Sequence, residues 1–147
     1  MKKFLASISM KLSEYYPDTT HYLQEIPEIL VRPSFFIELV SGDTEALNQT
    51  VFKDNFTFKV VYFSPINEAG AVDRILELEM MEGVRQIFNR PELPIVNTDR
   101  SAVITDRRIA VVNGEVQLFL ELYLIDSQEV IEDYTMMGQI KINNYYN

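Results

Sequence analysis

Residues 32–40 read RPSFFIELV, a proline followed by a strand-forming run with two adjacent phenylalanines. Successive side chains of a strand point to opposite faces of a sheet, so Phe35 and Phe36 cannot enter the same core. We expect Phe35 to face the core of the protein and Phe36 to face a second layer or a neighbouring chain. The sheet therefore has an aromatic side chain to cover on each of its faces.

Hydrophobic periodicity places further elements on both sides of this strand. Apolar residues spaced by three and four predict helices over 2–16 and 69–88, the second from the ladder Val72, Leu76, Met80, Val84 and Phe88. Alternation predicts strands over 35–40, 52–63, 101–112 and 115–126, with a polar turn over 41–50 and extended segments over 20–26 and 139–142. Asn113-Gly114 lies between the two late strands and is the strongest short signal for a hairpin.

These elements predict an α+β fold in a single domain over residues 1–147, with two helices packed on a largely antiparallel sheet of about four to five strands. Every second residue from Val116 to Leu124 is valine or leucine and forms an apolar face. The alternate positions of the same strand include Phe119 and Tyr123. Two helices leave part of one sheet face open, so Phe36, Phe119 and Tyr123 are candidates for contact with another chain.

Composition excludes several classes of protein. Thirteen Lys and Arg against 22 Asp and Glu give a net charge of −9, and the scattered bases form no stripe that suits tight binding of nucleic acid. The absence of cysteine excludes disulfides, thiolate metal sites and cysteine nucleophiles. No apolar run approaches the roughly 18 residues of a membrane span, and Lys11 and Glu14 interrupt the N-terminal apolar stretch. We expect neither a span nor a signal peptide.

The residues that carry catalysis or bind cofactors are sparse. His21 is the only histidine and has no serine motif around it, so we interpret it as structural or exposed. The chain has no glycine-rich phosphate loop, and its carboxylates near 126–133 lack the pattern of a calcium loop. Pro17-Asp18 is not followed anywhere by the carboxylate-x-lysine motif of metal-dependent nucleases. We expect no enzyme activity, no cofactor and no metal site.

The order of these segments resembles a known family. A helix ending in YYPD (15–18), the extended HYLQEIPEILVRPSFFIELV (21–40), the strand FKVVYF (58–63) and a long helix entered from FSPINEAGAVDR (63–74) are similar to the small tail-terminator, or tail-completion, proteins of tailed phages and of phage-tail-like bacteriocins of Gram-positive bacteria. The resemblance covers nearly the whole chain. The longer, more polar segment LPIVNTDRSAVITDRRIAVVNGEV (93–116) departs from the family pattern.

The resemblance implies a structural protein that forms a homo-oligomeric ring, a hexamer, on the head-proximal end of the tail tube. The ring would end polymerisation of the tube, and of the sheath in a contractile tail, and would dock neck or head-connector proteins. DNA would at most pass through it, and no membrane is involved. The location would be a virion tail or tail-like particle, assembled in the cytoplasm of the bacterial host. A head-completion (stopper) protein and a small non-enzymatic binding module are the alternatives.

A ring built from one kind of subunit needs two different, complementary surfaces on each copy. Phe36, Phe119 and Tyr123 on one sheet face are candidates for contact with another subunit or with the tube. The terminal segment Gln139, Ile140, Lys141 and Ile142 is the second candidate, because a late, weak strand can extend the sheet of a neighbouring chain.

Overall fold

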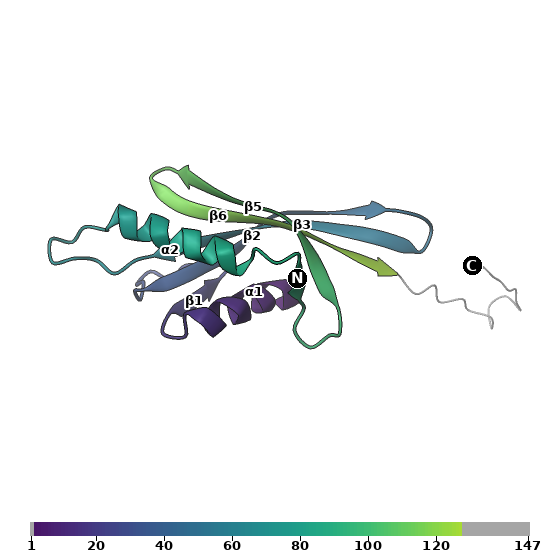
Figure 1. Ribbon diagram of the computed structural model, residues 1–147, viewed down its shortest axis with the longest axis horizontal. Helices are drawn as coiled ribbons and strands as arrows, with labels where there is room; N and C mark the ends of the chain where they lie inside the picture. Colours follow the sequence, from purple (N-terminus) through teal and green to yellow (C-terminus); the bar gives the residue numbers. More distant parts are fainter. Residues whose placement is uncertain (1, 128–147) are drawn as a thin grey trace, which may run out of the picture.

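The fold is a single curved sheet with two helices on one of its faces (Figure 1). The structure is a computed structural model and describes residues 2–127. The elements in that part of the chain are α1 (Lys2–Tyr15), β1 (Thr20–Leu23), β2 (Ser34–Ala46), β3 (Val51–Phe63), α2 (Arg74–Ile87), β4 (Glu92–Pro94), β5 (Ser101–Val112) and β6 (Glu115–Ser127). The strands lie side by side in the order β1-β2-β3-β6-β5-β4.

The prediction of two helices on a largely antiparallel sheet of four to five strands was wrong. The sheet has six strands over residues 2–127, and β1 runs parallel to β2 while the other neighbours are antiparallel. It curls into a half-barrel. This curl brings α1 into contact with both β2 and β4, which stand second and last in the strand order. The Ser7 hydroxyl of α1 accepts a hydrogen bond of 3.0 Å from the backbone N–H of Val96, just after β4.

The two shortest strands are the ones that the predicted sheet lacked: β1 lies in the segment expected only to be extended, and β4 was not predicted. β1 has four residues, and β4 has three and ends in a proline. Segments of this length contain at most two alternations, so a period of two cannot be recognised in them. Each pairs with only one end of its neighbour, β1 with residues 34–37 of β2 and β4 with residues 101–103 of β5. The rest of each outer edge has no partner strand among the residues that the structure describes.

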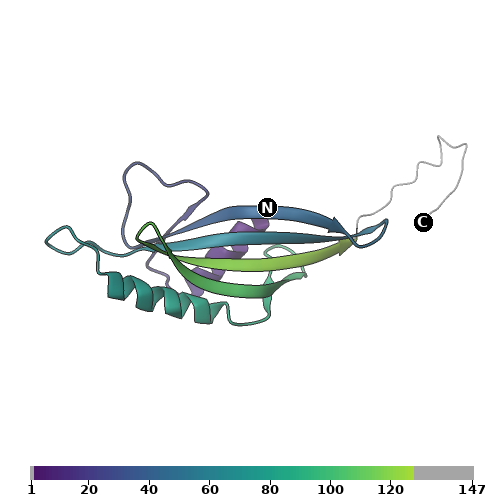
Figure 2. The same cartoon turned by 90° about the horizontal axis from the view of Figure 1, so that it is seen from above.

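β2 and β3 form a longer hairpin than the sequence predicted. β2 continues to Ala46 through residues expected in a turn, and the turn itself is residues 47–50. The side-chain oxygen of Asn48 accepts hydrogen bonds of 2.9 Å from the backbone N–H groups of Thr50 and Val51 and so holds the turn. Figure 2 shows that β2, β3 and β6 run past both helices at this end. Residues 41–46 are polar and exposed because no helix packs on them.

Both helices lie in the segments predicted for them, but α2 begins at Arg74 rather than near residue 69. The Asp73 carboxylate caps α2 by accepting hydrogen bonds of 3.0 and 3.1 Å from two backbone N–H groups of the first turn. Before it, the Asn67 side chain accepts two backbone hydrogen bonds and Gly70 has a φ of +77°, so this segment is a turn. The segment 66–73 therefore belongs to the connection, and its apolar residues are not held in the core by a helix.

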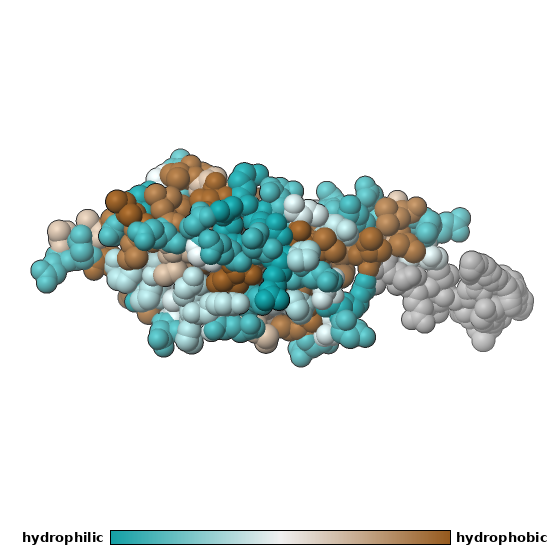
Figure 3. Space-filling view, in the orientation of Figure 1, coloured by the Kyte–Doolittle hydropathy of each residue, from teal (hydrophilic) through white to brown (hydrophobic). Residues whose placement is uncertain are grey.

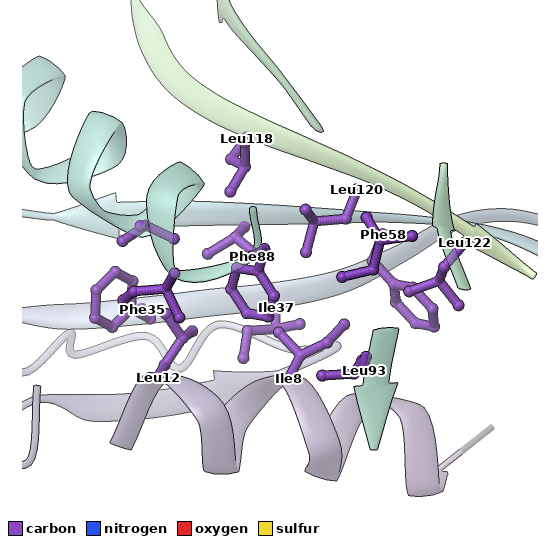
Figure 4. Packing of buried hydrophobic residues seen from close by; sticks show 14 of the residues in the cluster. Ile8, Leu12, Phe35, Ile37, Phe58, Phe88, Leu93, Leu118, Leu120 and Leu122 are labelled. Carbon is purple, nitrogen blue, oxygen red and sulfur yellow. The ribbon is translucent and has the colours of Figure 1, made fainter. Parts of the chain in front are cut away.

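The core lies between the helices and the face of the sheet that they cover (Figure 4). Phe35 has no exposed surface, and its ring lies 5.7 Å from those of Tyr16 and His21 and 5.1 Å from that of Tyr62, centre to centre. The prediction that Phe35 faces the core is confirmed. The alternate residues Val116 to Leu122 of β6 are buried on the same side, also as predicted. The remaining labelled residues of this core are Ile8, Leu12, Ile37, Phe58, Phe88 and Leu93.

Candidate assembly surface

Four aromatic rings on the face of the sheet turned away from the helices each lie near a cation. We call this the helix-free face; the four rings are those of Phe36 of β2, Phe63 of β3, and Phe119 and Tyr123 of β6, and Tyr22 of β1 lies beside Phe36 on the same face. The four ring centroids lie, in that order, 5.9 Å from Lys59 Nζ, 5.6 Å from Arg32 Cζ, 5.1 Å from Arg108 Cζ and 4.5 Å from Lys53 Nζ. Rings on the helix side contact one another instead. The two faces of the sheet thus cover their aromatic residues by different means.

The candidates Phe36, Phe119 and Tyr123 are brought together on this face by the pairing of β2, β3 and β6. They differ in accessibility. Phe36 is only 5 % exposed, so its own chain covers most of its ring, whereas Phe119 and Tyr123 are half-buried. The fourth candidate, the segment 139–142, lies outside the described residues. The part of the helix-free face that a second molecule can reach is therefore centred on the two β6 residues.

The connection between β1 and β2, residues 24–33, is tied to one end of the helix-free face. The hydroxyl of Tyr22, which is opposite Phe36 in the β1–β2 pairing, accepts a hydrogen bond of 3.0 Å from the backbone N–H of Val31. The Arg32 guanidinium donates a bond of 2.8 Å to the carbonyl oxygen of Ser64. These bonds hold the connection at the same end of the sheet as Phe36, where the face is closed within the chain.

His21 fastens β1 to α1. Its Nδ1 lies 2.6 Å from the Ser9 hydroxyl, and its Nε2 lies 3.2 Å from the hydroxyl of Thr19. The Thr19 hydroxyl donates to the backbone oxygen of Tyr16, so it is free to accept from Nε2–H, and Ser9 then donates to Nδ1. Burial lowers the pKa of His21 below its ordinary value, which favours this neutral form. Both ring nitrogens are engaged in structural bonds, in accord with the interpretation of this residue as structural.

The buried face of α2 differs at its start from the predicted ladder. Leu76 is 40 % exposed, while Glu77 is buried, with its carboxylate 3.4 Å from the Ser64 hydroxyl and 3.4 Å from Arg74 Nε. Burial raises the pKa of the nearby Tyr62 hydroxyl, and the Glu77 charge raises it further. The sequence did not indicate this buried carboxylate. A helical wheel shows which residues of α2 share a face, but it does not show which part of that face the sheet covers.

A second apolar surface lies at the start of α2 and the adjoining β5–β6 turn. Ile75 and Leu78 are 68 % and 41 % exposed, and Val111 of β5 is 60 % exposed. Arg74 links these segments, because its guanidinium lies beside Gly114 in the turn. Figure 3 shows apolar surface gathered at this end of the molecule. Sequence reasoning missed it because helical spacing alone does not show that the first turn of α2 extends beyond the sheet.

The described residues contain no group of three histidine, aspartate or glutamate side chains placed to hold a metal ion. No helix within residues 2–127 has the length and apolar content to cross a membrane. The arrangement that the structure does present is one of surfaces, namely an aromatic and cationic sheet face, an apolar helix end and two partly unpaired sheet edges.

Comparison with known proteins gives the family. A family model described as "Phage tail terminator protein" matches residues 3–134. The chain belongs to the phage tail terminator family. It is therefore a structural protein of the phage tail with a role in tail completion, as the sequence resemblance implied. The family associates with other tail proteins and has its place in the virion tail.

Other comparisons add little to this family assignment. No curated protein matches the sequence. A solved structure aligns over 89 % of this chain and 97 % of its own length, at 13 % identity and a TM-score of 0.43. Similarity at this level carries no argument about the function of the tail terminator.

Proposed function

We propose that this tail terminator assembles into a homo-oligomeric ring, a hexamer, on the head-proximal end of the tail tube. The ring ends polymerisation of the tube, and of the sheath in a contractile tail, and offers a docking face to neck or head-connector proteins. Phage tails and phage-tail-like bacteriocins are equally suited to such a ring. The observation that carries the proposal is the family match over residues 3–134, to which the helix-free face adds a surface suited to protein contact.

The contact surface is centred on Phe119 and Tyr123. Phe36 lies at its margin, where the Lys59 side chain covers its ring. Aromatic and arginine side chains are the residues that most often carry binding energy at protein interfaces. Arg108 lies over Phe119, so a partner that covers this face meets both kinds of side chain. The segment 139–142 is a further contact that we propose from sequence alone. The net charge of −9 is compatible with DNA passing through the ring without being held.

The test of the function is assembly of tails without this protein, viewed by electron microscopy. We expect tubes of uncontrolled length, or tails that fail to join heads. Tails of normal length that join heads would contradict the proposal. Binding to portal-side proteins but not to tube or sheath subunits would instead favour a head-completion (stopper) protein. A single 17 kDa species by light scattering, even in the presence of tube ends, would favour a monomeric binding module.

The test of the surface is the pair of substitutions Phe119→Asp and Tyr123→Asp. Both residues are half-buried on the helix-free face, so a carboxylate there should leave the fold intact and weaken ring formation. Met10→Asp is the matched control, because Met10 is an exposed apolar residue of α1 on the opposite side of the sheet. Unchanged rings in both variants would remove this face from the contact, whereas weakened rings in the control as well would point to a general effect of added charge.

A further inference from the structure

β2 and β5 each leave part of an outer edge unpaired among the described residues. On β2 the pairing with β1 ends at Ile37, and Gln24 then caps the edge. The Gln24 backbone N–H donates 2.9 Å to the Ile37 oxygen, and its side-chain oxygen accepts 2.5 Å from the N–H of Leu39. Residues 40–46 follow with no partner on this side in the part of the chain that the structure describes. This stretch of seven exposed residues is the free edge of β2.

The free edge of β5 lies at the other end of the sheet. Beyond the short β4, the Ile104 N–H donates 2.8 Å to the oxygen of Pro91, and the Arg107 guanidinium donates to the oxygens of Phe88 and Arg90. Residues 108–112 then have no strand beside them within residues 2–127. An open cleft of about 350 Å³ adjoins the start of this free edge, lined by Glu82, Arg85, Asp106, Arg107, Arg108 and Ile109. The cleft leaves room beside the edge for an incoming strand.

The two edges carry opposite charge. The free edge of β2, residues 40–46, holds two carboxylates, Asp43 and Glu45, and no basic residue. The free edge of β5, residues 108–112, holds Arg108 and no carboxylate. Two β2 edges therefore repel each other, while a β2 edge attracts a β5 edge. Charge thus disfavours the self-complementary contact of a two-fold dimer and favours the head-to-tail contact from which rings are built.

We propose that copies of this chain join edge to edge, with residues 41–45 of β2 in one copy pairing antiparallel with residues 108–112 of β5 in the next. This inference rests on the proposed ring and adds an edge contact between its subunits to the contact that the helix-free face makes with a neighbouring subunit or the tube. Side chains on the helix-free face must stay on the same side across the joint, so only every second register is possible. Among these, one register pairs all five free residues of β5 without displacing Gln24. In that register Glu45 lies opposite Arg108, and Asp43 lies opposite Ala110.

The shapes of the two edges fit this joint. β1 pairs with the part of β2 that lies outside the joint, and β4 pairs with the part of β5 that lies outside it. The short strands of the two subunits therefore do not collide. Within one subunit, the pairing of β2 with β3, β3 with β6 and β6 with β5 places Glu45 at the same height along the strands as the start of β5. In the joint, Glu45 instead lies at the height of Arg108 of the next subunit. Each subunit is therefore displaced along the strand direction by about 20 Å relative to its neighbour. The repeating unit of the ring is the four strands β2, β3, β6 and β5, which together are about 19 Å wide. The strands would then incline by about 45° to the ring axis, at the upper end of the range in closed barrels.

Cysteine cross-linking tests the joint directly, because the natural chain has no cysteine. Asp43→Cys and Ala110→Cys are made in separate chains, mixed, assembled and treated with a mild oxidant. Opposed residues of antiparallel strands lie at a distance that a disulfide can span. We expect a covalent dimer in the mixture only, and a ladder of covalent oligomers from the chain that carries both substitutions. The matched control combines Asp43→Cys with Glu79→Cys, an exposed position on α2, and should give no cross-link.

Charge exchange tests the predicted register. Arg108→Glu places two carboxylates opposite each other and should raise the concentration for half-assembly by about tenfold. Adding Glu45→Arg restores an opposite pair and should return assembly to within about threefold of the natural chain. Far-ultraviolet circular dichroism of each variant checks that the fold is kept. Rescue by Glu45→Arg that is no greater than rescue by Glu79→Arg, the same charge change at an exposed position of α2, would overturn the register.

The outcomes separate the joint from the proposed function. If rings or capped tails form but residues 43 and 110 do not cross-link, the edge joint is overturned and the proposed ring stands. Cross-linking of Asp43→Cys or Ala110→Cys chains with themselves shows a two-fold contact and also overturns it. If neither rings nor capped tails form with the natural chain, the proposed function fails and the joint fails with it.

Discussion

Replacing Phe35 with alanine should remove one of the largest stabilising contributions in the core. The side chain has no exposed surface and is surrounded by the rings of Tyr16, His21 and Tyr62. A buried phenylalanine truncated to alanine costs about 3–5 kcal/mol, from lost transfer free energy and from the cavity left behind. For a domain of this size each kcal/mol lowers the melting temperature by about 2–4 °C. We therefore expect a fall of roughly 6–20 °C.

The assay is urea and thermal unfolding followed by far-ultraviolet circular dichroism, at a protein concentration where the chain is a single species. Phe119→Ala is the matched control, because it removes the same atoms from a half-buried ring on the helix-free face. Its cost should stay below about 2 kcal/mol, mostly from partial burial and the contact with Arg108. A cost below 1 kcal/mol for Phe35→Ala, or equal costs for the two variants, would refute the assignment of the two faces.

Three further perturbations test local features by the same unfolding measurements. The pKa of His21 is lowered on folding, so the neutral form contributes stability that is fully present above its unfolded pKa of 6.5 and is lost as the pH falls below it; the stability difference between the natural chain and His21→Gln should shrink from pH 7 to 5, and a constant difference would contradict this. Asp73→Ala removes the cap of α2 and should cost about 0.5–2 kcal/mol, against almost nothing for Asp99→Ala in an exposed turn. Gly114→Ala places a β-carbon at a φ of +78° and should cost about 1–2 kcal/mol; a neutral result would show that the turn relaxes freely.

Much of the fold could be predicted because its longest elements have strong local signals. The β5–β6 hairpin has the expected bounds at its turn, and Asn113 and Gly114 have the positive φ angles, +51° and +78°, that their pairing predicts. α1 was predicted to within one residue from its apolar spacing. In these segments the local preference of the chain and its tertiary contacts agree, so periodicity alone identifies them.

The errors lie where tertiary context overrides local pattern. Residues 41–46 look like a turn because they are polar, yet they pair with β3 in a part of the sheet that no helix covers. β1 was expected only as an extended segment and β4 not at all, because both are too short to show alternation and depend on the longer strands beside them. The curl of the sheet depends on how α1 packs between its two sides, and no residue spacing records that.

The candidate surface was predicted only in part. Alternation placed Phe36, Phe119 and Tyr123 on one face, which the strand pairing reproduces. The cations above these rings come from β3, β5 and the connection before β2, so they could not be assigned without the strand order. The unpaired edges were also hidden, because whether a strand has a neighbour is a property of the sheet and not of the strand.

The cations over the helix-free face also affect the solubility of the protein before it assembles. A long side chain with a charged end hides apolar surface while keeping its charge in water. Lys53 and Arg108 can swing aside at little cost, because each holds its ring by only about 0.5–1 kcal/mol at an exposed site. Newly made copies would thus stay dispersed in solution, yet keep a surface ready for contact. In the ring proposed above, such a covered surface would let each copy remain soluble until a partner displaces the cations.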